Sequence, residues 1–214
     1  MSIPIPHYLK SIATLEKQTK QWTHFSLACP CGCKKFQVFE SYLTKEQRAL
    51  QQPYYDALGL IYSQSVPTTF TRDENGNRHY WRLYEPVKGL DGRHEEIIIP
   101  PCPFFSGIWV WKIVCNECGQ EYVLFDNRFH GYDGVFNEEA TKETLSYQPT
   151  FRRKCKDSVS LSVKVENDDS YEEFCENCGD DCTKEQYSNA FSWIVVYKID
   201  EKGKKTKIFE SETA

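Results

Sequence analysis

The chain has 214 residues, and its 11 glycines and 10 prolines exclude a collagen-like or low-complexity protein. Aromatic residues make up 14%, which is enough apolar surface for a core and excludes wholesale disorder. Lys and Arg number 26 and Asp and Glu 31, so the net charge is −5, a poor match for a polyanion such as nucleic acid. No stretch approaches the length of apolar sequence that crosses a bilayer, so we expect no membrane partner.

Helix and strand patterns alternate in the first half of the chain. In chain order they predict an amphipathic helix over residues 7–20, strands over 25–27 and 36–39 around a tight turn, a helix from Thr44, a hairpin tip at Asn75-Gly76, and strands over 80–85 and 97–99. The helix at Thr44 begins with a capping box, Thr44-Lys45-Glu46-Gln47. It should end or bend near Pro53, because proline has no amide hydrogen to donate within a helix.

Strand patterns dominate the second half. In chain order the sequence predicts strands over 108–114 and 121–125, a helix over about 137–146, a strand over 158–165, a helix that opens at Thr183, a strand over 191–199 and a loose charged tail over 200–214. The Thr-Lys-Glu-Gln capping box of residues 44–47 recurs at 183–186. Together these elements predict an α+β fold of short antiparallel strands and a few helices. A break near residue 148 would separate a domain over 1–148 from a smaller module over 149–214, unless the two form one domain.

Ten cysteines beside a single methionine are the unusual feature of the composition. The N-terminus lacks a basic start followed by an apolar run, so we expect no signal peptide and a cytoplasmic location. In a reducing compartment, so many cysteines bind metal more often than they form disulfides. Buried free thiols are the competing interpretation, and it suits Cys102, which has no cysteine near it in the sequence.

Two cysteine turns have the spacing of zinc ligands. Cys115 and Cys118 precede a glycine at the tip of one predicted β-hairpin, and Cys29, Cys31 and Cys33 form a turn at the tip of another. A structural zinc needs four ligands, usually two from each of two such turns. The predicted ligands are therefore Cys29, Cys31, Cys115 and Cys118, with Cys33 as the substitute for Cys31.

The two turns and their flanking strands resemble a zinc ribbon over residues 24–40 and 107–126, a resemblance that implies one structural zinc. About eighty residues separate the turns, which is more than a ribbon normally has, and would form a long insertion between the knuckles. Four further cysteines, Cys155, Cys175, Cys178 and Cys182, have the right count for a second zinc site. A thioredoxin-like redox pair is disfavoured, because that motif opens a helix whereas these pairs are expected between strands or in polar loops.

Three patterns are compatible with different functions. His94 and Glu96 followed by Cys115 and Cys118 resemble the zinc deaminase pattern, but strands are predicted where that family has helices. The loop after the second turn gathers Asp126, Arg128, His130 and Asp133, which suit either an acid–base site or a structured turn, and we favour the turn.

The basic run over 152–156 could meet phosphates, although four charges in an acidic chain more often form a solvated face. Among tryptophans that could stack on bases, Trp109 and Trp111 alternate in a strand, so at least one faces the core.

Four protein ligands leave no open position on zinc, so such a metal is structural. The sequence therefore predicts a non-catalytic zinc-stabilised binding or adaptor protein with one or two zinc ions, whose partner is another protein. Two functions compete with this prediction: a zinc-dependent hydrolase or deaminase-like enzyme that uses His94 or His130, and a nucleic-acid-binding protein.

Overall fold

The computed structural model describes residues 5–64, 70–83, 94–135, 141–166, 170–178 and 183–213. The chain divides into two compact units. Unit 1 comprises residues 1–42 and 108–214, and unit 2 comprises residues 43–107. Every paired strand in the described residues is antiparallel, and helices accompany the sheets, so the predicted α+β class is confirmed.

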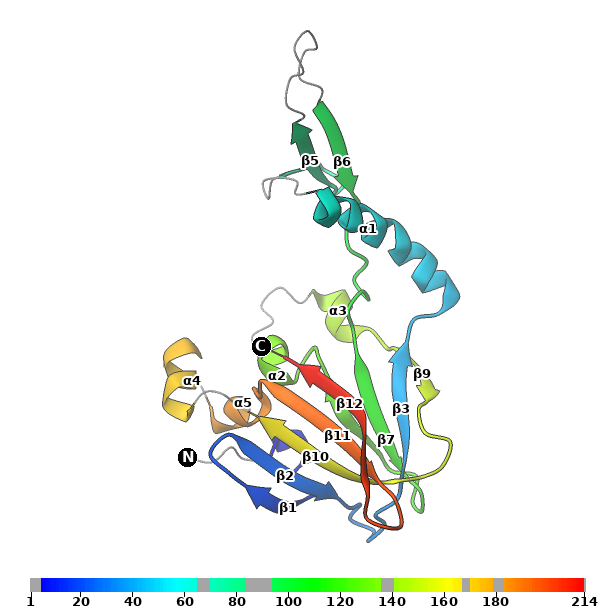
Figure 1. Cartoon of the computed structure of the whole chain (residues 1–214), viewed down its shortest axis with the longest axis vertical. Helices are drawn as coiled ribbons and strands as arrows, with labels where there is room; N and C mark the ends of the chain where they lie inside the picture. Colours follow the sequence, from blue (N-terminus) through cyan, green and yellow to red (C-terminus); the bar gives the residue numbers. More distant parts are fainter. Residues whose placement is uncertain are drawn as a thin grey trace. The chain divides into compact units, whose positions relative to one another are not determined.

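Unit 1 contains two sheets (Figure 1). The first has the order β1-β2-β10-β11-β12, with bounds Ala13–Gln18, Trp22–Leu27, Ser160–Glu166, Trp193–Ile199 and Lys205–Glu212. The second has the order β8-β7-β3-β9, with bounds Glu121–Asp126, Val110–Cys115, Phe36–Tyr42 and Thr150–Arg153. Neighbouring strands are thus often far apart in sequence.

One hydrophobic core joins the two sheets of unit 1. Burial alternates along β2, where Phe25 and Leu27 are buried, and side chains from both sheets belong to the same cluster. Across the core, the ring of Trp111 on β7 lies 4.6 Å from that of Phe209 on β12. Aromatic side chains supply large apolar area and favour such tilted contacts, so they stabilise the pairing of the two layers.

Unit 2 contains helix α1 (Lys45–Gln64) and a small sheet of β4 (Thr71–Arg72), β5 (Arg78–Leu83) and β6 (His94–Ile99). The predicted capping box is present, because Thr44 and Gln47 exchange hydrogen bonds of 2.9 and 3.3 Å. The helix does not end at Pro53, as it could have done, but continues through it. Beyond Pro53, Ala57 packs in a cluster with Ile97 and Ile99, and this burial outweighs the one lost hydrogen bond.

Two further predictions are wrong, and both concern strands at a sheet edge. Residues 7–20 form a short 3-10 helix, His7–Leu9, and then strand β1 instead of an amphipathic helix. The charged tail is not loose, because Lys205–Glu212 form β12 and bury Phe209. Both strands have one open edge, so they carry few apolar residues and a weak sequence pattern.

The helices of the second half are short: α2 (Gly131–Val135), α3 (Lys142–Ser146), α4 (Tyr171–Cys178) and α5 (Lys184–Asn189). The capping box at Thr183 and Gln186 is confirmed at the start of α5. Thr141 caps α3, and the earlier part of the helix expected over 137–146 falls outside the described residues.

The division into units does not coincide with the boundary expected near residue 148. Residues 149–214 share unit 1 with both cysteine turns, because β10 pairs with β2 and β9 pairs with β3. The separate unit is the segment between the turns, residues 43–107. Within the described ranges, no helix combines the length and the apolar character needed to cross a bilayer.

Candidate metal centre

The four thiols predicted as zinc ligands lie together in unit 1. The sulfur atoms of Cys29, Cys31, Cys115 and Cys118 all lie within 4.8 Å of one another. The closest approaches join the two turns, with 3.5 Å between the sulfurs of Cys29 and Cys118 and 3.5 Å between those of Cys31 and Cys115. Cys29 and Cys115 are buried, whereas Cys31 and Cys118 are exposed, so the cluster lies at the boundary of core and solvent.

The first turn connects the two sheets of unit 1. The amide of Cys29 donates to the carbonyl of Cys33 over 2.8 Å, and the amide of Gly32 donates to the carbonyl of Cys29. Gly32 has a φ of +93°, a conformation that glycine adopts without strain. The expectation of a hairpin here is wrong, because β2 and β3 belong to different sheets. The chain uses this turn to cross from one sheet to the other.

The second turn is the tip of a true hairpin. Strands β7 and β8 pair directly, and Cys115 is the last residue of β7. The amide of Gly119 donates to the carbonyl of Cys115 over 3.1 Å, and Gly119 has a φ of +73°. The half of the zinc-ribbon resemblance that covers residues 107–126 therefore describes the local backbone correctly.

Pairing of β3 with β7 explains how two distant turns share one site. Phe36 pairs with Cys115, so the start of β3 lies beside the end of β7. The amide of Asn116 also donates to the carbonyl of Lys35 over 3.0 Å, which joins the two turns directly. Antiparallel strands bring the end of β3 and the start of β7 together at the opposite end, and residues 43–107 are inserted there. The long spacing therefore does not affect the cluster.

Polar contacts to the sulfurs favour thiolate at the buried positions. The backbone amide of Cys118, with a smaller contribution from that of Glu117, lowers the pKa of Cys115 to about 6 despite burial. The hydroxyl of Tyr122, 3.2 Å from the sulfur of Cys29, lowers the pKa of that thiol. A thiolate is the form of cysteine that binds metal. Tyr122 is a contributor that the sequence did not single out, because a tyrosine on a strand carries no local signal of this contact.

The exposed thiols hold their protons more firmly. The backbone amide of Cys33 lowers the pKa of Cys31, but the neighbouring sulfur of Cys29, burial and the other two sulfurs together raise it to about 12. A thiol that shares a site with thiolates is harder to ionise, because like charges would then lie side by side. A divalent cation among the sulfurs would reverse this effect and favour four thiolates.

Cys33 is buried and does not belong to the four-thiol group. Its sulfur contacts the backbone of Lys35, with 3.3 Å to the carbonyl oxygen and 3.4 Å from the amide nitrogen. Cys33 also belongs to the hydrophobic core of unit 1. The structure thus groups Cys31, rather than Cys33, with the other three thiols.

The geometry of the four sulfurs fits tetrahedral zinc. Zn–S bonds of about 2.3 Å in a tetrahedron place sulfurs roughly 3.8 Å apart. The cross-turn distances of 3.5 Å and the upper limit of 4.8 Å bracket that value. Soft thiolate ligands in this arrangement select Zn²⁺ or an iron–sulfur centre over Mg²⁺ or Ca²⁺.

The second predicted set of cysteines is not assembled by the residues that the structure describes. Cys155 packs against the main core of unit 1, whereas Cys175 lies on helix α4 and packs against a separate cluster with Phe174. Cys175 is in a disulfide, in which its sulfur cannot serve as a thiolate ligand. Cys178 ends helix α4, and Cys182 lies outside the described residues. A second metal site stays a prediction.

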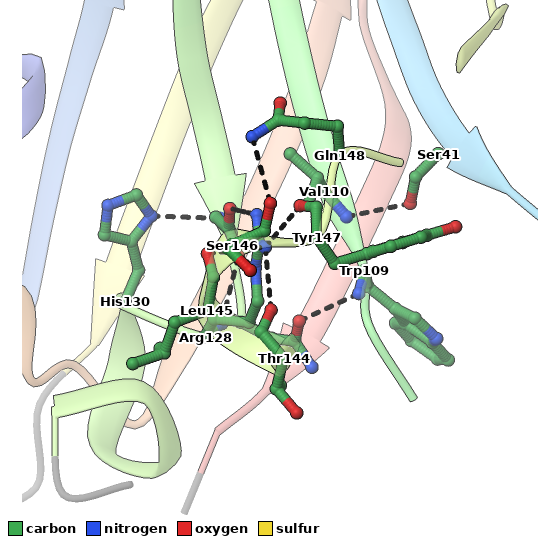
Figure 2. A network of polar contacts seen from close by, with 12 residues as sticks. Ser41, Trp109, Val110, Arg128, His130, Thr144, Leu145, Ser146, Tyr147 and Gln148 are labelled. Carbon is green, nitrogen blue, oxygen red and sulfur yellow. Dashed lines mark hydrogen bonds and ion pairs between the residues drawn. The ribbon is translucent and has the colours of Figure 1, made fainter. Parts of the chain in front are cut away.

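The polar loop after β8 is a structural corner (Figure 2). The Arg128 side chain forms two hydrogen bonds with the Asp126 carboxylate, of 2.9 and 2.6 Å, and both residues are buried. Arg128 Nη1 also donates to the carbonyls of Thr144, Leu145 and Tyr147 at the end of α3. These contacts satisfy groups that a helix end leaves without partners.

His130 completes the corner. Its Nδ1 accepts a hydrogen bond from the amide of Asp126 over 2.9 Å, and its ring stacks on Tyr8 at 3.6 Å. Burial lowers the pKa of His130 to about 4, with Asp126 opposing the shift. Asp133 is exposed and donates its backbone amide to the carbonyl of Thr213. These contacts favour the structured turn over an acid–base site.

The structure places the two halves of the deaminase-like pattern in different units and pairs two charges of the basic run with one carboxylate. His94 is in β6 of unit 2, whereas Cys115 and Cys118 are in unit 1 and group with two other cysteines. In the basic run, Arg152 and Lys154 both pair with the carboxylate of Glu40, each over 2.8 Å. These two ion pairs reduce the positive charge available to a phosphate.

Comparisons with known protein families, with curated proteins and with solved structures find no match for the chain. A function can therefore be proposed only from the geometry and chemistry of the four-thiol site.

Proposed function

We propose that this protein binds one Zn²⁺ through Cys29, Cys31, Cys115 and Cys118, and that the metal is structural. The observation that supports this proposal is the convergence of four sulfurs within 4.8 Å, two from each turn. Four thiolate ligands close the coordination sphere, so the metal has no position for a substrate or an activated water.

The metal would hold the point at which the chain crosses between sheets. Without it, the turn at Cys29–Cys33 is tied to the second turn mainly by the Asn116–Lys35 hydrogen bond and by the first pair of the β3–β7 ladder. Structural zinc contributes roughly 10–16 kcal/mol of apparent binding energy in small peptides, far more than one hydrogen bond. Zinc binding would thus contribute to the stability of unit 1 directly.

We further propose that the biological role is binding of another protein. Unit 2 leaves several large apolar side chains exposed, including Leu50 and Leu60 on α1 and Phe104 after β6. Exposed apolar side chains mark a protein contact where they gather into one patch, and that is the arrangement this proposal requires of them. The net charge of −5 and the Glu40 pairing of Arg152 and Lys154 weigh against a nucleic-acid partner.

Elemental analysis of untagged protein measures the zinc content per chain, and variants at two exposed cysteines, Cys102 and Cys118, form a matched pair. We expect one zinc per chain in the wild type and in Cys102→Ser, whose side chain lies outside the four-thiol group. Cys118→Ser should lose most of the zinc and lower the melting temperature of unit 1. Cys33→Ser should destabilise the core but keep the zinc.

Two outcomes would change the proposal. Protein without metal, or a Cys118→Ser variant that keeps its full zinc, would refute it. Two zincs per chain would support the second predicted site at Cys155, Cys175, Cys178 and Cys182, with the disulfide of Cys175 reduced so that its sulfur can bind metal. Protein partners are tested by comparing wild type with a Leu50→Glu, Leu60→Glu variant in cross-linking from cell extract, and equal cross-linking would refute the use of this surface.

A further inference from the structure

The four thiols are arranged in two pairs that each join one turn to the other. Each pair joins one buried and one exposed cysteine residue: Cys29 with Cys118, and Cys115 with Cys31. The exposed members give a small oxidant access to one sulfur of each pair. The buried member then lies 3.5 Å away, within reach of a small side-chain movement.

We propose that this centre is also a peroxide-responsive switch, in which a hydroperoxide releases the zinc and converts the four ligands into two cross-turn disulfides. This inference rests on the proposed zinc site. In each half-reaction the exposed thiolate attacks the peroxide and becomes a sulfenic acid, and the buried thiolate of the other turn displaces its oxygen as water. Four thiolates, two hydrogen peroxides and four protons thus give two disulfides, four waters and free Zn²⁺.

The backbone around the centre favours cross-turn disulfides over a disulfide within one turn. The Asn116–Lys35 hydrogen bond and the Phe36–Cys115 pairing hold the turns together independently of metal. The third cysteine of the first turn, Cys33, is occupied by the backbone of Lys35 and buried in the core, which keeps it from exchanging with the pairs. The two disulfides would join the same two segments that zinc joins. Unit 1 should therefore stay folded after zinc release.

Tryptic mapping distinguishes the possible products. Cleavage after lysine and arginine places Cys29, Cys31 and Cys33 on the peptide 21–34, and Cys115 and Cys118 on the peptide 113–128. After two equivalents of hydrogen peroxide per zinc, followed by alkylation, we expect the two peptides to be linked by two disulfides with a single alkylated cysteine, Cys33. Zinc should appear in solution at one equivalent, and the circular dichroism of unit 1 should be unchanged.

The internal reference is Cys102, which is exposed but lies outside the four-thiol group and is carried by a different tryptic peptide. Its alkylation should be unaffected at this dose. Unlinked peptides with a Cys115–Cys118 disulfide, sulfonic acids at the ligands, or unfolding on zinc release would overturn the inference. Zinc content is measured before peroxide is added, so a metal-free protein refutes the proposed function, whereas a zinc-loaded protein with the wrong product refutes only the switch.

Discussion

Replacement of Arg128 by methionine should strongly destabilise unit 1. Arg128 and the carboxylate of Asp126 are both buried, with side chains 8% and 7% exposed, and the methionine would leave that carboxylate without its ion partner. Removing one member of a buried pair typically costs about 3–5 kcal/mol, because the remaining charge has neither water nor a counterion. The three carbonyls at the end of α3 lose a donor as well, so we expect a loss of about 4 kcal/mol.

A surface pair on the neighbouring strands provides the control. Lys112 and Glu121 form an ion pair of 3.0 Å, but the Glu121 side chain is 60% exposed. Solvent screens such a pair, and its removal in Lys112→Met should cost less than about 1 kcal/mol. The double variant Arg128→Met, Asp126→Asn should be more stable than Arg128→Met alone, since it leaves no buried charge at this corner.

Urea unfolding of the zinc-loaded protein, followed by tryptophan fluorescence, measures these differences. Four of the five tryptophans, Trp22, Trp109, Trp111 and Trp193, belong to unit 1, so the signal reports mainly that unit. If Arg128→Met and Lys112→Met lost similar stability, or if the double variant were the least stable, the role of this corner as a buried structural ion pair would be refuted.

Three more predictions test the fold around the centre. Gly131→Ala should destabilise unit 1 by more than about 2 kcal/mol, since Gly131 has a φ of +78° and a Cβ would collide with Thr213. The control Gly203→Ala has the same φ and open space around the Cβ, so it should cost only the conformational penalty of about 1–2 kcal/mol, and equal urea midpoints for the two variants would contradict the prediction. Burial lowers the pKa of His130 from 6.5 to about 4, so the stability that the neutral ring contributes is complete above pH 6.5 and falls by about 3 kcal/mol as the pH drops toward 4. His130→Phe should remove this part of the pH dependence of the unfolding free energy, and a variant with the same pH profile as the wild type would refute the prediction. Replacement of residues 43–107 by a short glycine-rich turn should leave the zinc content at one per chain, because this segment connects β3 to β7 at the end of the strand pair away from the cysteines. Loss of zinc from this variant would count against that topology.

The central strands and the edge strands β6 and β8 were predictable from the sequence, whereas the edge strands β1 and β12 were not. In β10, Leu161, Val163 and Val165 alternate with polar residues, and β11 contains the run Ile194-Val195-Val196, so both have a clear strand pattern. In β1, by contrast, five of six residues are exposed, and the chance spacing of Leu9, Ile12 and Leu15 imitates a helix. Pairing with β2 decides the conformation of β1, and this long-range term is invisible in a local pattern.

The cysteine cluster was predictable in its membership but not in its setting. The Cys115-x-x-Cys118-Gly spacing fixes a local turn, and the need for four ligands pointed to Cys29 and Cys31. The choice against Cys33 depends on how the turn at Gly32 directs the next side chain into the core. The local sequence does not show that Cys29–Cys33 crosses between two sheets. The crossover follows from strand pairing, because β2 pairs with β10, which comes more than a hundred residues later, while β3 pairs with β7 and β9 in the other sheet.

The position of the centre in the topology explains why a metal is useful there. Strand β2 is held along its length by pairing with β1 and β10, and β3 is held by pairing with β7 and β9. Among the described strands, however, no β-ladder joins the two sheets at the point where the chain leaves β2 and enters β3. Apart from the bridge between Phe36 and Val159, cohesion at this end depends on side chains. A tetrahedral ion that takes two ligands from the crossover and two from the β7–β8 tip would supply a directional link at that point. Opening a coordination position for a substrate would weaken that link, which is why we propose a structural ion here.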